Sequence, residues 1–310
     1  MSLYSMLKAK GPNGFGYGST AEDVTAGLSL AGKTFLVTGC NSGLGLETAR
    51  VLALRGGRIF GTARTTEKAT TALAPLGGNT LGFECELSDP ASVRGSVKAV
   101  VSALKGSKID ALICNAGIMA LPELKQAFGL ELQFFTNHIG HFLLVTGLLN
   151  QLALADEGRV VMLSSAAHKQ APKGGIEFDN LAGERDYAAW KAYGQSKMAN
   201  LLFAKELARR FEGTKKTANS VHPGVIFTNL SRHMNPLVRF AFGLGERLLL
   251  KSAGEGSATT CYVAVHPGAA AISGKFFADC NVTEPRADGS DAETAKKLWA
   301  ASEEIVARLP

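Results

Sequence analysis

The 310-residue sequence lacks any run of about 18 apolar residues, so it contains no candidate membrane-spanning helix. Its first residues lack a basic stretch followed by an apolar segment, and we therefore expect no signal peptide. The net charge is +6, but no run of basic residues is longer than a pair. Because nucleic-acid-binding proteins concentrate positive charge on one face or in one run, we expect no nucleic-acid partner.

Cysteine is sparse, and its spacing is typical of neither a disulfide framework nor a zinc site. The five cysteines lie far apart, and none belongs to a C-x-x-C pair. An odd number of widely spaced cysteines indicates reduced thiols in a cytosol-like compartment. The sequence therefore predicts a cytoplasmic protein without a bound metal. The five are Cys40, Cys85, Cys114, Cys261 and Cys280.

The sequence does contain a regular alternation of short β-rich runs with helix-length segments. This alternation predicts an α/β fold: a doubly wound, Rossmann-type, seven-stranded parallel sheet with helices on both faces. Right-handed crossovers favour the strand order 3-2-1-4-5-6-7. The predicted strands are Lys33–Thr38, Arg58–Ala63, Thr80–Cys85, Ile109–Cys114, Arg159–Ser164, Ala218–His222 and Lys275–Ala278. The clearest predicted helices are Thr48–Arg55, Ala91–Leu104, Glu131–Leu149, Ala188–Phe211, Gly254–Val265 and a final helix, Asp291–Arg308.

The chain divides into an extension and one domain. Residues 1–31 are rich in glycine and polar side chains, which is typical of a segment that lies on a domain surface or is partly disordered. Residues 32–310 carry all the predicted strands and are expected to form a single domain. In such sheets ligands bind beyond the carboxyl ends of the strands, so functional residues should follow strands.

A glycine-rich loop follows the first predicted strand, with the sequence Thr38-Gly39-Cys40-Asn41-Ser42-Gly43-Leu44-Gly45. Glycine permits a tight turn and lets backbone N–H groups approach a pyrophosphate at the N-terminus of the next helix. The loop is therefore a phosphate cradle or a simple strand–helix turn, and its place after the first strand favours the cradle. The candidate contacts are Gly39, Asn41, Ser42, Gly43 and Leu44.

The second predicted strand ends in Gly61-Thr62-Ala63-Arg64 and offers no acidic side chain. A carboxylate at this place would bind the ribose hydroxyls of NAD and repel a 2′-phosphate. The guanidinium of Arg64 can instead form a bidentate, charge-assisted pair with that phosphate. The strand end therefore favours NADP(H), the alternative being an arginine that faces solvent at the start of a loop.

Tyr193 and Lys197 are spaced so that they share one face of a predicted helix, one turn apart. An ammonium near a phenol stabilises the phenolate and lowers its pKa from about 10, which makes the phenol a better proton shuttle at neutral pH. A Y-x-x-x-K pattern also arises by chance. Here the fifth predicted strand ends in Ser164-Ser165, where a hydroxyl can hydrogen-bond a substrate oxygen.

These motifs, taken in order over about residues 32–280, resemble those of the short-chain dehydrogenase/reductase family. The T-G-x-x-x-G-x-G spacing, Asn115-Ala116-Gly117 and the Y-x-x-x-K pair all match that family. The segments Asn137–Leu144, Ala192–Phe203 and Ser273–Cys280 look most like its branch of retinol dehydrogenases and WW-domain oxidoreductase. The resemblance implies a catalytic tetrad of Asn137, Ser165, Tyr193 and Lys197, and it excludes Ser164.

The resemblance also implies most of the cofactor contacts. Glu86 stands where the family usually has an aspartate that contacts adenine, with Leu87 beside it. Asn115-Ala116-Gly117 passes close to the cofactor ribose, and the segment from Pro223 to Thr228 resembles P-G-x-I-x-T, which binds the nicotinamide end. The implied set, beyond the glycine-rich loop, is Arg64, Glu86, Leu87, Asn115, Ala116, Gly117, Tyr193, Lys197, Pro223, Gly224, Ile226 and Thr228.

The activity implied is hydride transfer between NADP(H) and a carbonyl or alcohol carbon, with Tyr193 as the proton donor. Two stretches, 168–190 and 229–251, are expected to wall the substrate pocket, and their apolar content suits a hydrophobic ketone, aldehyde or secondary alcohol. The second stretch could instead touch another subunit or a membrane. A homodimer or homotetramer fits the family. A catalytically silent NADP-binding sensor or scaffold is the alternative function.

Overall fold

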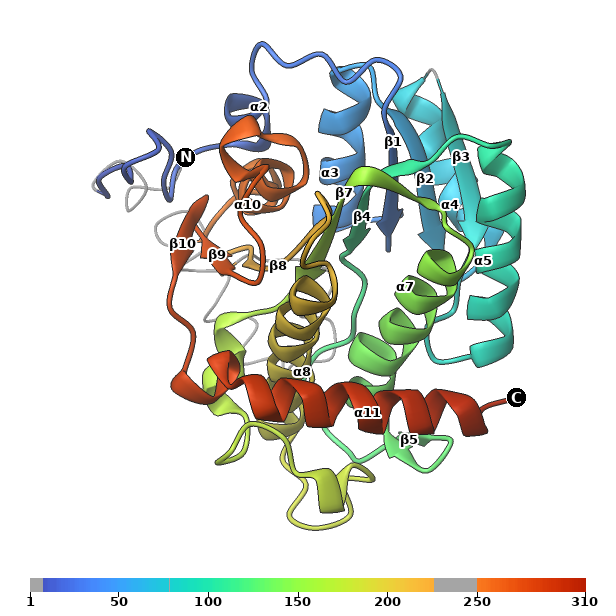
Figure 1. Ribbon diagram of the computed structural model, residues 1–310, viewed down its shortest axis with the longest axis vertical. Coiled ribbons are helices and arrows are strands. Elements are labelled where there is room, and N and C mark those ends of the chain that lie inside the picture. Colours follow the sequence, from blue (N-terminus) through green and yellow to red (C-terminus); the bar gives the residue numbers. More distant parts are fainter. Residues whose placement is uncertain (1–7, 78, 226–249) are drawn as a thin grey trace.

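The computed structural model describes residues 8–77, 79–225 and 250–310, and its centre is an eight-stranded, mostly parallel sheet with helices on both faces (Figure 1). The strand order is β10-β9-β8-β7-β4-β1-β2-β3. The sheet strands are β1 (Thr34–Thr38), β2 (Arg58–Ala63), β3 (Thr80–Glu84), β4 (Ile109–Cys114), β7 (Leu154–Leu163), β8 (Thr217–His222), β9 (Phe276–Ala278) and β10 (Asn281–Thr283). A small hairpin joins β5 (Gln126–Ala127) to β6 (Leu130–Glu131).

The main helices connect these strands. They are α2 (Ala21–Val24), α3 (Gly43–Leu54), α4 (Thr66–Leu73), α5 (Pro90–Leu104), α6 (Leu132–Phe134), α7 (Gly140–Asn150), α8 (Ala189–Arg210), α10 (Ala253–Val265) and α11 (Ala292–Arg308). A π-helical turn, η2 (Phe135–Ile139), joins α6 to α7, and a short 3₁₀ helix, η3 (Ala166–Gln170), follows β7. The predicted helix over 131–149 is thus interrupted by the π-helical turn.

The predicted fold class and the relative order of the seven predicted strands are confirmed, since β3, β2, β1, β4, β7, β8 and β9 run parallel in that order. The predicted number of strands is wrong, because an eighth strand, β10, pairs antiparallel with β9. Between them, Asp279 and Cys280 have φ values of 51° and 63°. Tight hairpin turns with this backbone usually contain glycine or asparagine, and the Asp279-Cys280 pair contains neither, so no turn was predicted here.

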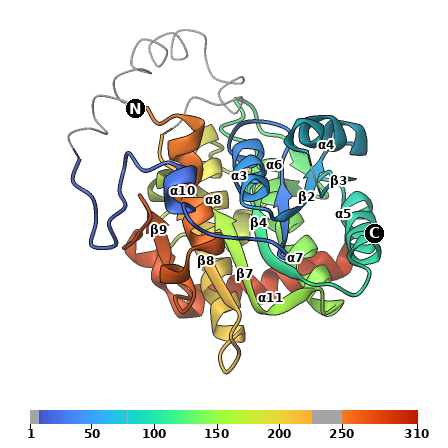
Figure 2. The same ribbon diagram turned by 90° about the horizontal axis from the view of Figure 1, so that it is seen from above.

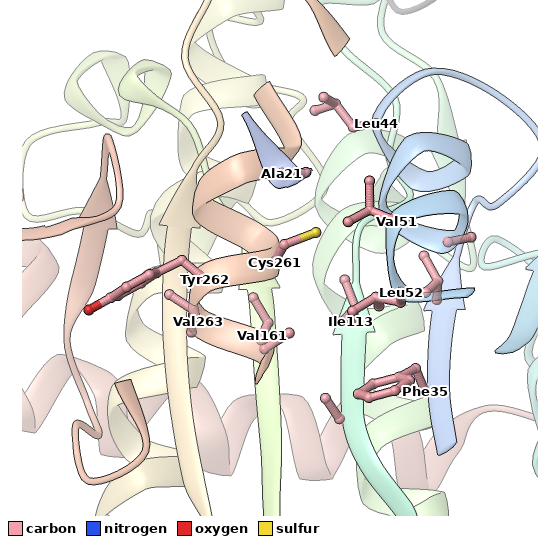
Figure 3. Close-up of a cluster of buried hydrophobic side chains, with 14 of the residues drawn as sticks. Ala21, Phe35, Leu44, Val51, Leu52, Ile113, Val161, Cys261, Tyr262 and Val263 are labelled. Atoms are coloured by element: carbon pink, nitrogen blue, oxygen red, sulfur yellow. The ribbon is translucent and has the colours of Figure 1, made fainter. Parts of the chain in front are cut away.

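The core consists of one apolar layer on each face of the sheet. Phe35 and Val37 of β1 pack with α3 and α10, whereas Leu36 between them packs with α5 and α7. Successive side chains of a strand point to opposite faces, so β1 contributes to both layers. Figure 3 shows side chains of α3 and α10 gathered over the central strands. The two layers hold the carboxyl ends of the strands at one edge.

Both ends of the described chain pack on the outside of this sandwich. α11 crosses α8, and Trp299 of α11 stacks there on Phe203 with ring centroids 5.5 Å apart (Figure 1). Residues 8–31 pass beside α10, as Figure 2 shows for α2. Ala21 and Val24 of α2 are buried there. The segment that was expected to lie on the surface therefore contributes to the core.

The five cysteines are buried and free, as their spacing predicted. Within residues 8–77, 79–225 and 250–310, no helix is both long and apolar enough to cross a membrane. The same residues contain no cluster of three or more histidine, cysteine or acidic side chains suited to a metal ion.

Candidate active site

A cavity of about 330 Å³ lies at the carboxyl ends of the central strands. It is lined by most of the predicted cofactor residues, from four segments that follow strands: Gly39, Asn41, Ser42, Gly43, Leu44, Arg64, Glu86, Leu87, Asn115, Ala116 and Gly117. Sequence reasoning missed five more lining residues: Ala63, Cys85, Ile118, Thr136 and Leu163. Ala63, Cys85 and Leu163 stand at strand ends, which is a signal that could have identified them. Ile118 and Thr136 carry no such signal.

The glycine-rich loop forms one wall of this cavity. Gly39 and Gly43 have φ values of 67° and 54°, a left-handed backbone that disfavours other residues. Helix α3 starts at Gly43, five positions before the predicted Thr48, so its first N–H groups belong to the loop. The N-cap residue Ser42 makes no side-chain capping bond. These N–H groups are therefore available to an anionic ligand.

At Gly45, the last glycine of the loop, the structure leaves no room for a side chain. A Cβ atom there would lie 2.2 Å from the Gly39 carbonyl oxygen and 2.5 Å from Asn115 Nδ2. We expect Gly45→Ala to cost about 2–3 kcal/mol of unfolding free energy, because backbone must shift to relieve the overlap. Gly95→Ala in α5 is the matched control: no atom lies within 4 Å of its Cβ position, and alanine favours helix. Urea denaturation of both variants checks this, and equal stabilities would contradict it.

Asn115 ties the ends of β1 and β4 together beneath the cavity. Its backbone N–H and that of Ala116 donate to Thr38 Oγ1 at 2.9 and 3.0 Å, and Asn115 Nδ2 donates to the Thr38 carbonyl at 2.9 Å. Since Thr38 Oγ1 accepts two bonds, its own proton is donated to His141 Nε2, 2.9 Å away. His141 Nδ1 then carries a proton and donates it to the Asn137 carbonyl at 2.9 Å.

Asn137 sits in the π-helical turn η2, and its side chain is fixed on three sides. Its Oδ1 accepts from the Ile118 N–H at 2.8 Å, while Nδ2 donates to the Ile118 carbonyl and to Ser196 Oγ, both at 2.9 Å. Asn137 and Lys197 both approach Gly117, where an added Cβ would lie 2.9 Å from Asn137 Oδ1 and 3.5 Å from Lys197 Nζ. The turn therefore brings Asn137 beside the lysine, as the predicted tetrad requires.

Helix α8 presents Tyr193 and Lys197 to the end of β7. Both residues are buried, and the Lys197 ammonium lies 5.6 Å from the centre of the Tyr193 ring. Lys197 Nζ also donates to the Leu163 carbonyl at 3.1 Å. Ser165 and Tyr193 are close enough to hydrogen-bond through their side chains. Ser164 is turned elsewhere, since its hydroxyl donates to the Lys197 carbonyl at 2.8 Å.

Burial controls the acidity of these groups. It raises the pKa of Tyr193 to about 12, with the Ser165 hydrogen bond acting in the opposite direction. Burial also lowers the pKa of Lys197 to about 8 and that of His141 to about 4. Burial thus opposes the lowering of the Tyr193 pKa that is expected from Lys197 and a bound cofactor together, because removing the phenolate from water costs free energy. At neutral pH Tyr193 is a protonated donor beside a charged lysine.

Arg64 and Glu86, two predicted cofactor contacts, differ in the hydrogen bonds and ion pairs that their side chains form. Arg64 is exposed at the end of β2, and none of the ion pairs among the described residues involves it. Glu86 Oε1 accepts from the backbone N–H and the hydroxyl of Ser88, at 3.2 and 2.8 Å. That carboxylate is therefore oriented by a local turn, while Arg64 remains open to a ligand.

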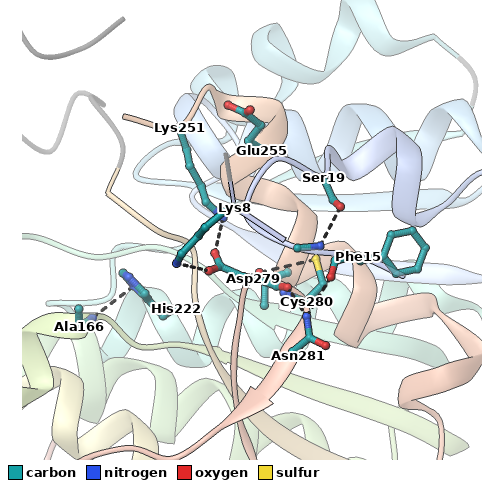
Figure 4. A network of polar contacts seen from close by, with 12 residues as sticks. Lys8, Phe15, Ser19, Ala166, His222, Lys251, Glu255, Asp279, Cys280 and Asn281 are labelled. Carbon is teal, nitrogen blue, oxygen red and sulfur yellow. Dashed lines mark hydrogen bonds and ion pairs between the residues drawn. The ribbon is translucent and has the colours of Figure 1, made fainter. Parts of the chain in front are cut away.

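The segment after β8 packs against Lys251. Gly224 has a φ of 93°, and a Cβ there would lie 2.6 Å from Lys251 Cδ. Lys251 is buried and forms a 2.7 Å ion pair with the part-buried Asp279, and His222 lies nearby (Figure 4). The predicted contacts Pro223 and Gly224 are not among the residues that line the cavity. The predicted contacts Ile226 and Thr228, and residues 229–249 of the second predicted wall, lie outside the described residues.

Comparison with known proteins agrees with this geometry. A family described as short chain dehydrogenase matches residues 33–237. Short-chain dehydrogenase TIC 32 A, chloroplastic, of Brassica napus is 41% identical over 327 residues and covers 100% of both chains. Human retinol dehydrogenase 14 is 38% identical over 300 residues, covering 90% of this chain and 88% of its own.

Solved structures show the same fold. A putative uncharacterized protein from Mycobacterium paratuberculosis superposes with a TM-score of 0.75 at 34% identity, covering 94% of this chain and 98% of its own. A short chain dehydrogenase from Burkholderia cenocepacia in complex with NADP has a TM-score of 0.64 at 23% identity, covering 80% and 96%. The second likeness concerns the fold alone.

Proposed function

The chain belongs to the short-chain dehydrogenase family, and on that premise we propose that it is an NADP(H)-dependent oxidoreductase acting on a hydrophobic ketone, aldehyde or secondary alcohol. One observation carries the proposal: Tyr193, Lys197 and Ser165 meet at the strand end that borders the glycine-lined cavity. A sensor without catalysis would not need this buried arrangement.

The cavity has the features that a dinucleotide requires. The N-terminus of α3 offers N–H groups that the Ser42 side chain does not cap. Thr136 lines the cavity, and its buried hydroxyl has no hydrogen-bond partner among the described residues. A buried hydroxyl is rarely left without a partner, so a ligand atom fits there. Arg64 is exposed, lines the cavity and supplies the cation that a 2′-phosphate would need.

The chain's own residues supply proton transfer and alignment, while the bound cofactor supplies the hydride. In carbonyl reduction, the Tyr193 hydroxyl donates its proton to the substrate oxygen as negative charge develops there. The Ser165 hydroxyl donates a hydrogen bond to the same oxygen. The Lys197 ammonium stabilises the phenolate left on Tyr193. Asn137 lies beside Lys197, where a water held next to its side chain would resupply the proton that Tyr193 gives up.

The apolar substrate class is supported by the described wall of the pocket. Trp190 is 41% exposed, and its ring meets that of Tyr193 edge-on with centroids 6.0 Å apart. An exposed tryptophan next to the proton donor provides apolar surface for a bulky substrate. A series of aldehydes and ketones of increasing chain length, followed by NADPH absorbance, tests the function. Turnover that rises with apolar bulk supports it, and no turnover of any carbonyl or alcohol with either cofactor contradicts it.

Lys197 is expected to set the alkaline limit of carbonyl reduction. Its pKa of about 8 means that it is charged below pH 8 and loses its proton as the pH rises through that value. The cation that stabilises the Tyr193 phenolate is then lost, and kcat/KM should fall by about tenfold per pH unit above pH 8. Lys197→Arg, which stays charged, should move this limb to higher pH. A profile that is flat from pH 7 to 9.5 in the unmodified protein would exclude Lys197 from this role.

A further inference from the structure

The position of the Ser165 hydroxyl depends on the loop that follows it. Ser165 is the N-cap of η3, and its Oγ accepts from the Ala167 N–H at 3.2 Å. On one side, the Ala166 N–H donates to His222 Nδ1 at 3.2 Å (Figure 4). On the other side, η3 packs against α8 at Gly194, where a Cβ would lie 2.6 Å from the Ala167 carbonyl oxygen. Helix α8 carries Tyr193 one residue earlier.

His168 links this loop to the C-terminal tail. Its Nδ1 lies 2.6 Å from the Ser165 carbonyl oxygen, and its Nε2 lies 3.1 Å from the backbone N of Arg286. A carbonyl only accepts and an N–H only donates, so Nδ1 carries the proton and Nε2 is the acceptor. The ring is 1% exposed and meets Phe276 of β9 edge-on at 5.2 Å. His168 therefore transmits the position of residue 286 to Ser165.

The Arg286 guanidinium holds the rest of the loop. It donates to the carbonyls of Lys169 at 3.0 Å, Ala171 at 2.7 Å and Pro172 at 2.6 Å. Asp288 accepts from the same guanidinium at 2.7 and 2.6 Å and so fixes its plane. One side chain, 118 positions from His168 in sequence, thus binds three carbonyls that follow Ser165. The rigid fork of arginine suits this task, which lysine's single ammonium does not match.

We propose that Arg286 is a positioning residue for the reaction: through His168 and η3 it sets the Ser165 hydroxyl against the Tyr193 hydroxyl. The proposal rests on the proposed oxidoreductase function. Among the described residues, Arg286 forms no hydrogen bond or ion pair with the cavity residues, Tyr193 or Lys197, so its expected effect is on alignment. Displacement of a catalytic group by about 1 Å can lower a rate by about 10²-fold.

The first test is kinetic and compares Arg286→Ala with Arg308→Ala. We expect Arg286→Ala to lower kcat by about 10- to 100-fold while the Kd for NADPH changes by less than about twofold. Arg308 is the matched control: it follows Arg286 in the C-terminal part of the chain and pairs with Glu304 at 3.6 Å, but its side chain is 79% exposed and lies on α11, outside the site. Added guanidinium ion should restore part of the lost kcat, and ammonium should not. Equal kcat in both variants would overturn the proposal.

A double-mutant cycle then tests the route through His168. If Arg286 acts on Ser165 by way of His168, Arg286→Ala should have little further effect on kcat in a His168→Phe background. If the double variant instead loses kcat by the product of the two single-variant factors, the two side chains act independently and the proposed route is wrong.

A measurement without substrate separates this proposal from the proposed function. Amide hydrogen exchange of the peptide spanning residues 165–172 should be faster in Arg286→Ala than in Arg308→Ala, with the β1 peptide unchanged in both. Unchanged exchange in that peptide would overturn the positioning role even in an active enzyme. Faster exchange in a protein that reduces no carbonyl would leave the loop contacts supported and reject the oxidoreductase proposal.

Discussion

Replacement of Tyr193 by phenylalanine is expected to lower kcat/KM for carbonyl reduction by about 10²- to 10⁴-fold, the range a positioned general acid contributes. Phenylalanine keeps the buried ring, its edge-on contact with Trp190 and its proximity to the Lys197 ammonium. Only the hydroxyl is lost. The Kd for NADPH, measured by quenching of protein fluorescence, should therefore stay within about threefold of the unmodified value.

Tyr187→Phe is the matched control for this substitution. Tyr187 lies six residues before Tyr193, and burial raises the pKa of both tyrosines to about 12. Its hydroxyl, however, donates to the Leu121 carbonyl at 2.7 Å. We expect near-normal kcat in this variant. Activity at the unmodified rate in Tyr193→Phe would show that another group donates the proton.

Replacement of Arg64 by aspartate is expected to raise the Kd for NADPH by about 10²-fold or more and to change the Kd for NADH by less than about threefold. Loss of a charge-assisted hydrogen bond alone costs about 1.5–3 kcal/mol, and the new carboxylate repels the 2′-phosphate. Arg64 is exposed and lines the cavity at the end of β2, so its loss should leave the fold unchanged.

Arg64→Lys distinguishes charge from geometry at this position. Lysine keeps the positive charge but not the bidentate fork, and an intermediate Kd for NADPH is expected. Equal losses of affinity for both cofactors in Arg64→Asp would mean that Arg64 does not contact the 2′-phosphate.

The parallel sheet could be predicted because β1, β4 and the second half of β7 are largely apolar runs that glycine or a polar residue follows. The bounds of β2 and β4 agree with the prediction residue for residue. β7 begins at Leu154, earlier than predicted, because Asp156, Glu157 and Gly158 interrupt its apolar pattern. β10 was missed because it is three residues long and follows a turn without glycine.

The parts of the candidate site that could be predicted are those whose residues lie close together in the sequence. The glycine-rich loop and the Tyr193–Lys197 pair are patterns within a few residues of sequence, and the structure brings them to the same edge. The direction of the Tyr193 pKa shift was not predictable, because burial depends on packing from several elements. The link between His168 and Arg286 was not predictable from sequence. The His168 ring bonds the backbone N of Arg286, and the Arg286 guanidinium bonds backbone carbonyls, and any residue type offers such backbone groups.

The N-terminal part of the described chain packs on the β9–β10 hairpin, which bears on how the protein folds during synthesis. Asn13 donates to the Cys280 carbonyl at 2.6 Å, and Asn281 donates to the Phe15 carbonyl at 3.1 Å. Chains leave the ribosome from the N-terminus, so residues 13 and 15 cannot make these contacts until residues 280 and 281 have been translated. The Arg286 contacts with residues 169–172 form equally late. On the proposed positioning role, a nascent chain can assemble β1 to β8 while Ser165 is still unaligned, and alignment follows only once residue 286 has been translated.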